Sequence, residues 1–157
     1  MDKEKFDLKT EYEKLNNKLP KFEDLNSEFE LSNANIKNKD FLVKSIRRRI
    51  NDKLIFYCRI IEGLIYPNSN NIIGMVEIKS FTDEEKIKMN NLYKKLMEYE
   101  RLSLSLDVNS DDKKEADYIN NLFKEWKKFK EEMINITKKM TESWHLEEKE
   151  EKDNYFG

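Results

Sequence analysis

Apolar residues recur every three or four positions along most of this chain, which is the spacing of a helix with one buried face. The longest such stretch covers residues 41–66, with Val43, Ile46, Ile50, Leu54, Tyr57, Ile61 and Leu64 in its stripe. From Leu54 onward the stretch is apolar on nearly every side, and a helix of that kind is normally buried all round. We therefore expect a central helix over 41–66, with a core formed by Tyr57, Ile60, Ile61 and Leu64.

Two further long helices follow in the pattern. Thr82 and Glu85 in "FTDEEK" have the spacing of a capping box, which predicts the start of a helix over 83–105. The next helix is expected over 111–145, where acidic residues favour its positive N-terminal end. Its apolar residues alternate spacings of three and four, as in a coiled coil. They are Ile119, Leu122, Trp126, Phe129, Met133, Ile136 and Met140.

Shorter apolar segments surround these helices. Tyr12 and its neighbours before Pro20, and then Phe22 to Phe29, predict two short N-terminal helices. The segment 72–81, "IIGMVEIKSF", fits either a strand or an apolar connector packed on the helices. We favour the connector, because an isolated strand has no partner for its backbone hydrogen-bonding groups.

Composition agrees with a helical chain. Charged residues make up 39% and apolar residues 38% of the 157 positions, with only three glycines and two prolines. That length suits one domain with a single core. The predicted fold class is all-α, a compact helical bundle of three long helices plus short N-terminal helical segments. We expect one bundle domain over 1–145 and a charged flexible C-terminal tail over 146–157.

The net charge, the length of the longest apolar run and the single cysteine limit which partners and which cellular compartment we expect. The net charge of -2 gives no overall attraction to nucleic acid or to an anionic membrane. The apolar run 54–66 includes Arg59 and Glu62 and is shorter than the about 20 residues that span a bilayer. The single cysteine cannot form an internal disulfide, and the N-terminus lacks the apolar stretch of a secretory signal. We expect an intracellular, cytoplasmic protein without membrane contact.

A basic cluster on the first long helix could contact phosphate groups. The candidates are Lys44, Arg47 and Arg48. The competing interpretation is a solvated flank, in which Arg49 pairs with Asp52 and the arginine stems cover apolar neighbours. We favour the solvated flank, because proteins that contact nucleic acid directly usually carry a basic bias over the whole domain.

The residue types of catalytic and metal sites are scarce. Glu142 and His145 form the Glu-x-x-His pair of di-iron bundles, but such a site uses the pair twice and the chain has one histidine. One cysteine and one histidine are too few for a zinc site built from those residues. Cys58 lies on the apolar half of its helix and is expected to be buried and inert. We therefore expect no catalytic residue, no cofactor and no metal, and a protein that is not an enzyme.

The order of a short N-terminal segment, a long basic helix and a helix that starts at "FTDEEK" resembles the helical subunits of the GINS replication complex. The resemblance lies in the general arrangement of helices. No segment of this sequence predicts the small β-domain that those subunits often carry, and the resemblance assigns no family.

Long apolar helix faces without catalytic groups favour a non-catalytic interaction or scaffold protein that acts through helix–helix contacts. The last helix, at about 52 Å for 35 residues, is longer than the others and should overhang the bundle. The candidate partner interface is Met133, Ile136, Met140 and Trp144, with Trp144 as the anchor. It would bind a second copy, giving a homodimer, or another protein. The alternative is a nucleic-acid-associated helical protein that uses the basic patch on helix 41–66.

Overall fold

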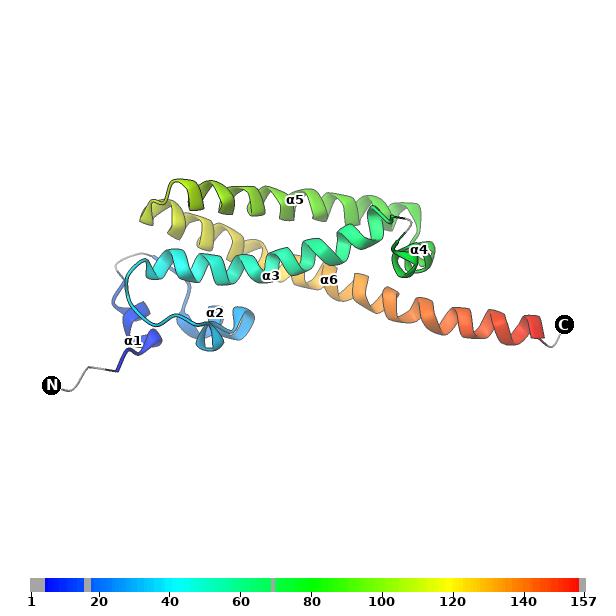
Figure 1. Cartoon of the computed structure of the whole chain (residues 1–157), viewed down its shortest axis with the longest axis horizontal. Helices are drawn as coiled ribbons and strands as arrows, with labels where there is room; N and C mark the ends of the chain where they lie inside the picture. Colours follow the sequence, from blue (N-terminus) through cyan, green and yellow to red (C-terminus); the bar gives the residue numbers. More distant parts are fainter. Residues whose placement is uncertain (1–4, 16–17, 69, 156–157) are drawn as a thin grey trace. The chain divides into compact units, whose positions relative to one another are not determined.

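A computed structural model describes the backbone of residues 5–15, 18–68 and 70–155, and the side chains up to residue 145. These residues form six α-helices and two short 3-10 turns, and none of them belongs to a strand. Three helices are long: α3 (Leu42–Ile65), α5 (Asp83–Val108) and α6 (Asp112–Tyr155). The short ones are α1 (Leu8–Glu13), α2 (Phe22–Phe29) and α4 (Ile72–Glu77). The all-α bundle with three long helices is confirmed (Figure 1).

Local chemistry explains several helix starts. The amide of Thr82 donates to Glu85 Oε2 at 2.8 Å, and the amide of Glu85 donates to Thr82 Oγ1 at 3.2 Å. This is the reciprocal capping box that the sequence predicts at the start of α5. At the start of α6, Asp111 Oδ1 accepts from the amides of Lys113 and Lys114 at 2.9 and 3.1 Å. Both helices therefore begin where a side chain satisfies their first free amides.

The structure differs from the predicted elements at several places. α5 ends at Val108, three residues beyond the predicted end at 105. Phe41 precedes α3, with its backbone in the left-handed region at φ 55°. Residues 72–80 form no strand but a helical connector, α4 followed by the 3-10 turn Ile78–Ser80, because helical hydrogen bonds satisfy the backbone within the segment itself. The helical backbone of α6 continues to Tyr155, beyond the expected end at 145. The flexibility of residues 146–157 stays a prediction.

Contacts divide the chain into two units that share the three long helices. The first unit holds the residues up to Ile55 together with Glu98–Trp126. The second holds Phe56–Met97 together with the residues from Lys127 onward. The prediction of one domain over 1–145 is left untested by this division.

In the first unit, α2 packs against the long helices through Phe29. Its ring lies 4.7 Å from the Trp126 ring, between centroids, and Trp126 Nε1 donates to Glu28 Oε2 at 3.0 Å. Trp126 is therefore a core residue, as the sequence predicts. The other fully buried apolar side chains of this unit are Leu25, Leu31, Ile46, Ile50, Leu54, Ile119 and Leu122.

In the second unit, the later half of α3 contributes much of the core. Tyr57, Ile61 and Leu64 are buried, as predicted, and Cys58 is buried beside them. Ile60 is only half-buried, and Phe56 is exposed. The expectation that this half of the helix is covered on all sides is therefore wrong, because one side of it faces solvent. The other buried apolar residues of this unit are Phe81, Met89, Leu92, Leu96, Phe129, Met133 and Ile136.

Candidate interaction site

The structure separates the three consecutive arginines of α3. Arg47 is fully buried in the first unit, where its Nε donates to Glu115 Oε2 at 2.7 Å. Its Nη1 donates to Ser103 Oγ at 2.7 Å, and its Nη2 to Asp107 Oδ1 at 2.7 Å. One guanidinium thus joins α3 to the end of α5 and the start of α6. The hydrogen bond from Arg47 is the main cause that lowers the pKa of Asp107 below its usual value.

This placement corrects the sequence interpretation of Arg47, both as a phosphate contact and as part of a solvated flank. A buried guanidinium that already binds two carboxylates cannot contact a phosphate without abandoning them. A signal for this was in the sequence. Arg47 follows Val43 by four positions and precedes Ile50 by three, so it lies on the buried stripe of α3.

The neighbouring basic residues lie closer to the surface. The Arg48 side chain is 58% exposed, and its Nε donates to Asp107 Oδ1 at 2.9 Å. Arg49 Nε donates to the carbonyl of Phe29 at 3.0 Å, so the expected Arg49–Asp52 pair is replaced by a contact with α2. Lys44 is half-buried. The phosphate-contacting hypothesis therefore retains Lys44 and Arg48 only.

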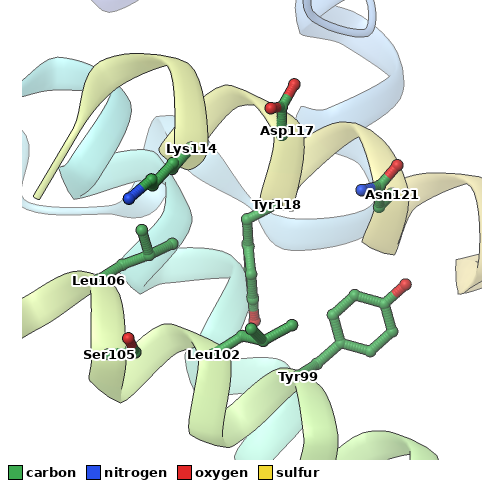
Figure 2. A pocket seen from close by; sticks show the side chains of 8 residues that line it. All are labelled: Tyr99, Leu102, Ser105, Leu106, Lys114, Asp117, Tyr118 and Asn121. Atoms are coloured by element: carbon green, nitrogen blue, oxygen red, sulfur yellow. The ribbon is translucent and has the colours of Figure 1, made fainter.

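A pocket of about 260 Å³ lies between α5 and α6 in the first unit (Figure 2). Figure 2 shows Tyr118 reaching from α6 toward α5, with Lys114 and Leu106 to one side of it and Tyr99 to the other. The rings of Tyr99 and Tyr118 meet edge to face at 5.7 Å between centroids. The remaining lining residues are Leu102, Ser105, Asp117 and Asn121.

Two of the residues that line this pocket are tyrosines with raised pKa values. Burial raises the pKa of both Tyr99 and Tyr118, so each phenol stays neutral near pH 7. The Tyr99 hydroxyl donates to Glu125. Within the described part of the chain, no group of three or more His, Cys, Asp or Glu side chains is placed to hold a metal ion.

The four residues of the candidate partner interface on α6 lie in the second unit and divide into two pairs. Met133 and Ile136 are buried within the chain itself, so neither offers surface to a partner. Met140 is half-buried, and Trp144 is 41% exposed. The indole Nε1 of Trp144 donates to Glu77 Oε1 at 2.9 Å, which holds the ring beside α4. Of the candidate interface, Met140 and Trp144 remain at the surface.

An apolar surface that the sequence interpretation missed lies on α4. Ile72, Ile73 and Met75 are 70%, 60% and 48% exposed, whereas Gly74 and Glu77 are buried. The signal available in the sequence was a local lack of charge. Residues 63–81 contain two charged side chains, Glu77 and Lys79, in a chain in which 39% of the residues are charged.

The contacts of α4 explain why its apolar side chains face outward. Asn71 caps the helix by accepting from the amide of Gly74 at 3.0 Å, and its Nδ2 donates to the carbonyl of Gly63 at the end of α3 at 3.1 Å. A Cβ atom at Gly74 would lie 2.1 Å from Gly63 O, so only glycine permits this approach. Beyond α4, Lys139 Nζ donates to the carbonyl of Ser80 at 3.1 Å. Both ends of the segment are therefore fixed.

The sequence matches no protein-family model, and comparison with curated proteins and with solved structures finds no match. Among the helices in the described part of the chain, none is both long and apolar enough to cross a membrane.

Proposed function

We propose that this chain is a non-catalytic helical protein that binds another protein chain through one apolar surface of its second unit. This surface, the α4 face, consists of Ile72, Ile73 and Met75 on α4 together with Trp144 on α6. The observation that carries the proposal is the exposure of three large apolar side chains within four positions of a helix fixed by the Gly74–Gly63 contact.

The composition of the α4 face supports a protein partner. Isolated exposed apolar residues are common on protein surfaces, but contiguous apolar patches usually mark sites of interaction. The centres of protein interfaces are poor in charge and rich in methionine and aromatic residues. Glu77 is buried and engaged by Trp144, so Lys79 is the exposed charged residue of the whole segment 63–81.

The rigidity of α4 supports the same function. A flexible loop could turn isoleucines inward and cover them, whereas the capped and glycine-packed α4 holds them in solvent. A surface that is already ordered loses little conformational entropy when it binds. Exposure of these apolar side chains to water is unfavourable for the free protein, and binding of a partner at the α4 face would remove them from water.

Site-specific photocrosslinking in cells that express the chain naturally tests the proposal. A photoreactive amino acid at Ile73 should give a discrete protein adduct. The matched control is the same substitution at Val108, a residue of the first unit that is 90% exposed. Equal adducts at the two positions, or none at Ile73, would contradict an interaction through the α4 face.

A further inference from the structure

We infer that the occupant of the α4 face is a second copy of this chain, bound in a symmetric dimer. This inference rests on the proposed function and names the partner of the same surface. It is carried by the charge distribution around α4, the size of the apolar surface and the position of Trp144.

The charges around α4 suit a contact between identical surfaces. In a two-fold dimer the same patch meets itself, so a patch with charge of one sign would repel its copy. The centre of the α4 face is apolar, and Glu77 is withdrawn from solvent by its hydrogen bond with Trp144. Charges of both signs follow in the sequence, because Lys79 is exposed and Asp83, at the start of α5, has a fully exposed side chain. A second copy therefore brings compatible charges, whereas a strongly acidic or basic partner would find no opposing cluster within 63–81.

Trp144 enlarges the surface beyond α4. Its hydrogen-bond acceptor Glu77 lies one helical turn after Ile73, so the indole adjoins the Ile73 side of α4. The exposed part of the ring thus continues the apolar surface from α4 onto α6. An indole fixed at its polar end with its ring partly exposed is a typical anchor of an interface.

The size of the surface is at the threshold for a specific dimer. The four side chains of the α4 face expose on the order of 500 Å², which is near the upper limit of apolar patches on monomeric proteins. Two such faces would bury about 1,000 Å², the least that a specific interface usually requires. An interface at this lower limit is typical of weak or transient complexes, so the dimer should be weak.

Sedimentation velocity of the full chain provides the test, at protein concentrations from about 1 to about 200 μM. The wild type should pass from monomer to dimer over this range. Ile72→Glu combined with Met75→Glu should weaken dimerisation at least tenfold, because it buries charge at the centre of the contact. Val108→Glu is the control, since it places one such charge at an exposed apolar residue of the first unit, and it should behave as the wild type. Thermal unfolding at the lowest concentration should agree among the three proteins, because the substituted side chains are exposed.

A wild type that stays monomeric at the highest concentration overturns the inference, as does a dimer that survives the double substitution or disappears with Val108→Glu. The mass of the crosslinked adduct from Ile73 distinguishes a failure of the dimer inference from a failure of the proposed function. An adduct of twice the mass of the chain supports both. An adduct with a different protein, together with a monomeric purified chain, overturns the second copy as occupant and leaves the proposed function standing.

Discussion

Arg47 and Glu115 form an ion pair in which neither side chain is exposed to solvent, although 68 residues separate them in the sequence. Burying such a pair is favourable only when the remaining donors and acceptors are also satisfied. Ser103 and Asp107 occupy the other nitrogens of Arg47, and Ser110 Oγ donates to Glu115 Oε1 at 3.1 Å. The ion pair therefore fixes how α3, the end of α5 and the start of α6 align within the first unit.

Removing the carboxylate of Glu115 should destabilise the protein strongly. Glu115→Ala leaves a buried guanidinium without its fully buried carboxylate partner, and we expect the free energy of unfolding to fall by about 3–5 kcal/mol. Unfolding in urea, followed by circular dichroism, measures this loss.

The control is Arg48→Met. It removes the bond from Arg48 to Asp107, but this side chain is 58% exposed, so the free energy of unfolding should change by less than about 1 kcal/mol. Equal losses in the two variants would show that the buried Arg47–Glu115 pair contributes no more to the free energy of unfolding than the exposed contact of Arg48 does.

Acid should weaken the same cluster through Asp107. Its pKa in the folded protein lies below the value of about 3.9 expected in the unfolded chain, chiefly because Arg47 donates a hydrogen bond to it. The ionised carboxylate therefore stabilises the fold fully at pH values above the unfolded pKa, and this stabilisation is lost as the pH falls through the folded pKa. Urea midpoints measured between about pH 6 and pH 2 should fall less steeply in Asp107→Asn than in the wild type. Parallel curves would contradict the prediction.

The nucleic-acid alternative now depends on Lys44 and Arg48. We expect no mobility shift of a labelled RNA or DNA oligonucleotide by the wild type at low salt, because one ion-paired arginine and one lysine give few phosphate contacts. Lys44→Glu with Arg48→Glu should leave thermal stability nearly unchanged, since surface charges contribute little to it. A shift by the wild type that is lost in this variant would instead favour nucleic-acid association.

Periodicity and capping chemistry were sufficient to predict the long helices. The Thr82–Glu85 capping box and the α3 stripe with Tyr57, Ile61 and Leu64 are local or regular features, and the structure has them as the sequence indicates. Arg47 was misplaced because a charged side chain on an apolar stripe is buried only when distant carboxylates meet it. Spacing along one helix does not reveal Asp107 or Glu115.

The low charge of residues 63–81 was visible in the sequence, but the outward orientation of the α4 side chains was not, for a related reason. A helix of six residues has too few turns to show a period, and its exposure depends on a contact between Gly63 and Gly74 that only the folded chain brings about. The place of Trp144 at the end of the α6 stripe predicts it as the anchor of a partner interface, and this role stays a prediction; its ring is 41% exposed. The sequence could not show that Glu77 holds the indole beside α4.

Alanine at the two glycines of this contact should have opposite consequences. At Gly74 the new Cβ would lie 2.1 Å from the carbonyl oxygen of Gly63, a backbone atom that cannot move away without shifting α3 or α4. We expect Gly74→Ala to lower the free energy of unfolding by about 1–3 kcal/mol, as overpacking usually does. It should also weaken self-association, because α4 and its isoleucines are displaced.

At Gly63 the nearest atom would be Asn71 Nδ2 at 3.4 Å, and alanine favours a helix interior over glycine by about 0.5–1 kcal/mol. Gly63→Ala should therefore leave stability unchanged or raise it slightly. Thermal unfolding and sedimentation of the two variants make the comparison, and equal effects would mean that the close approach at Gly74 does not hold α4 in place.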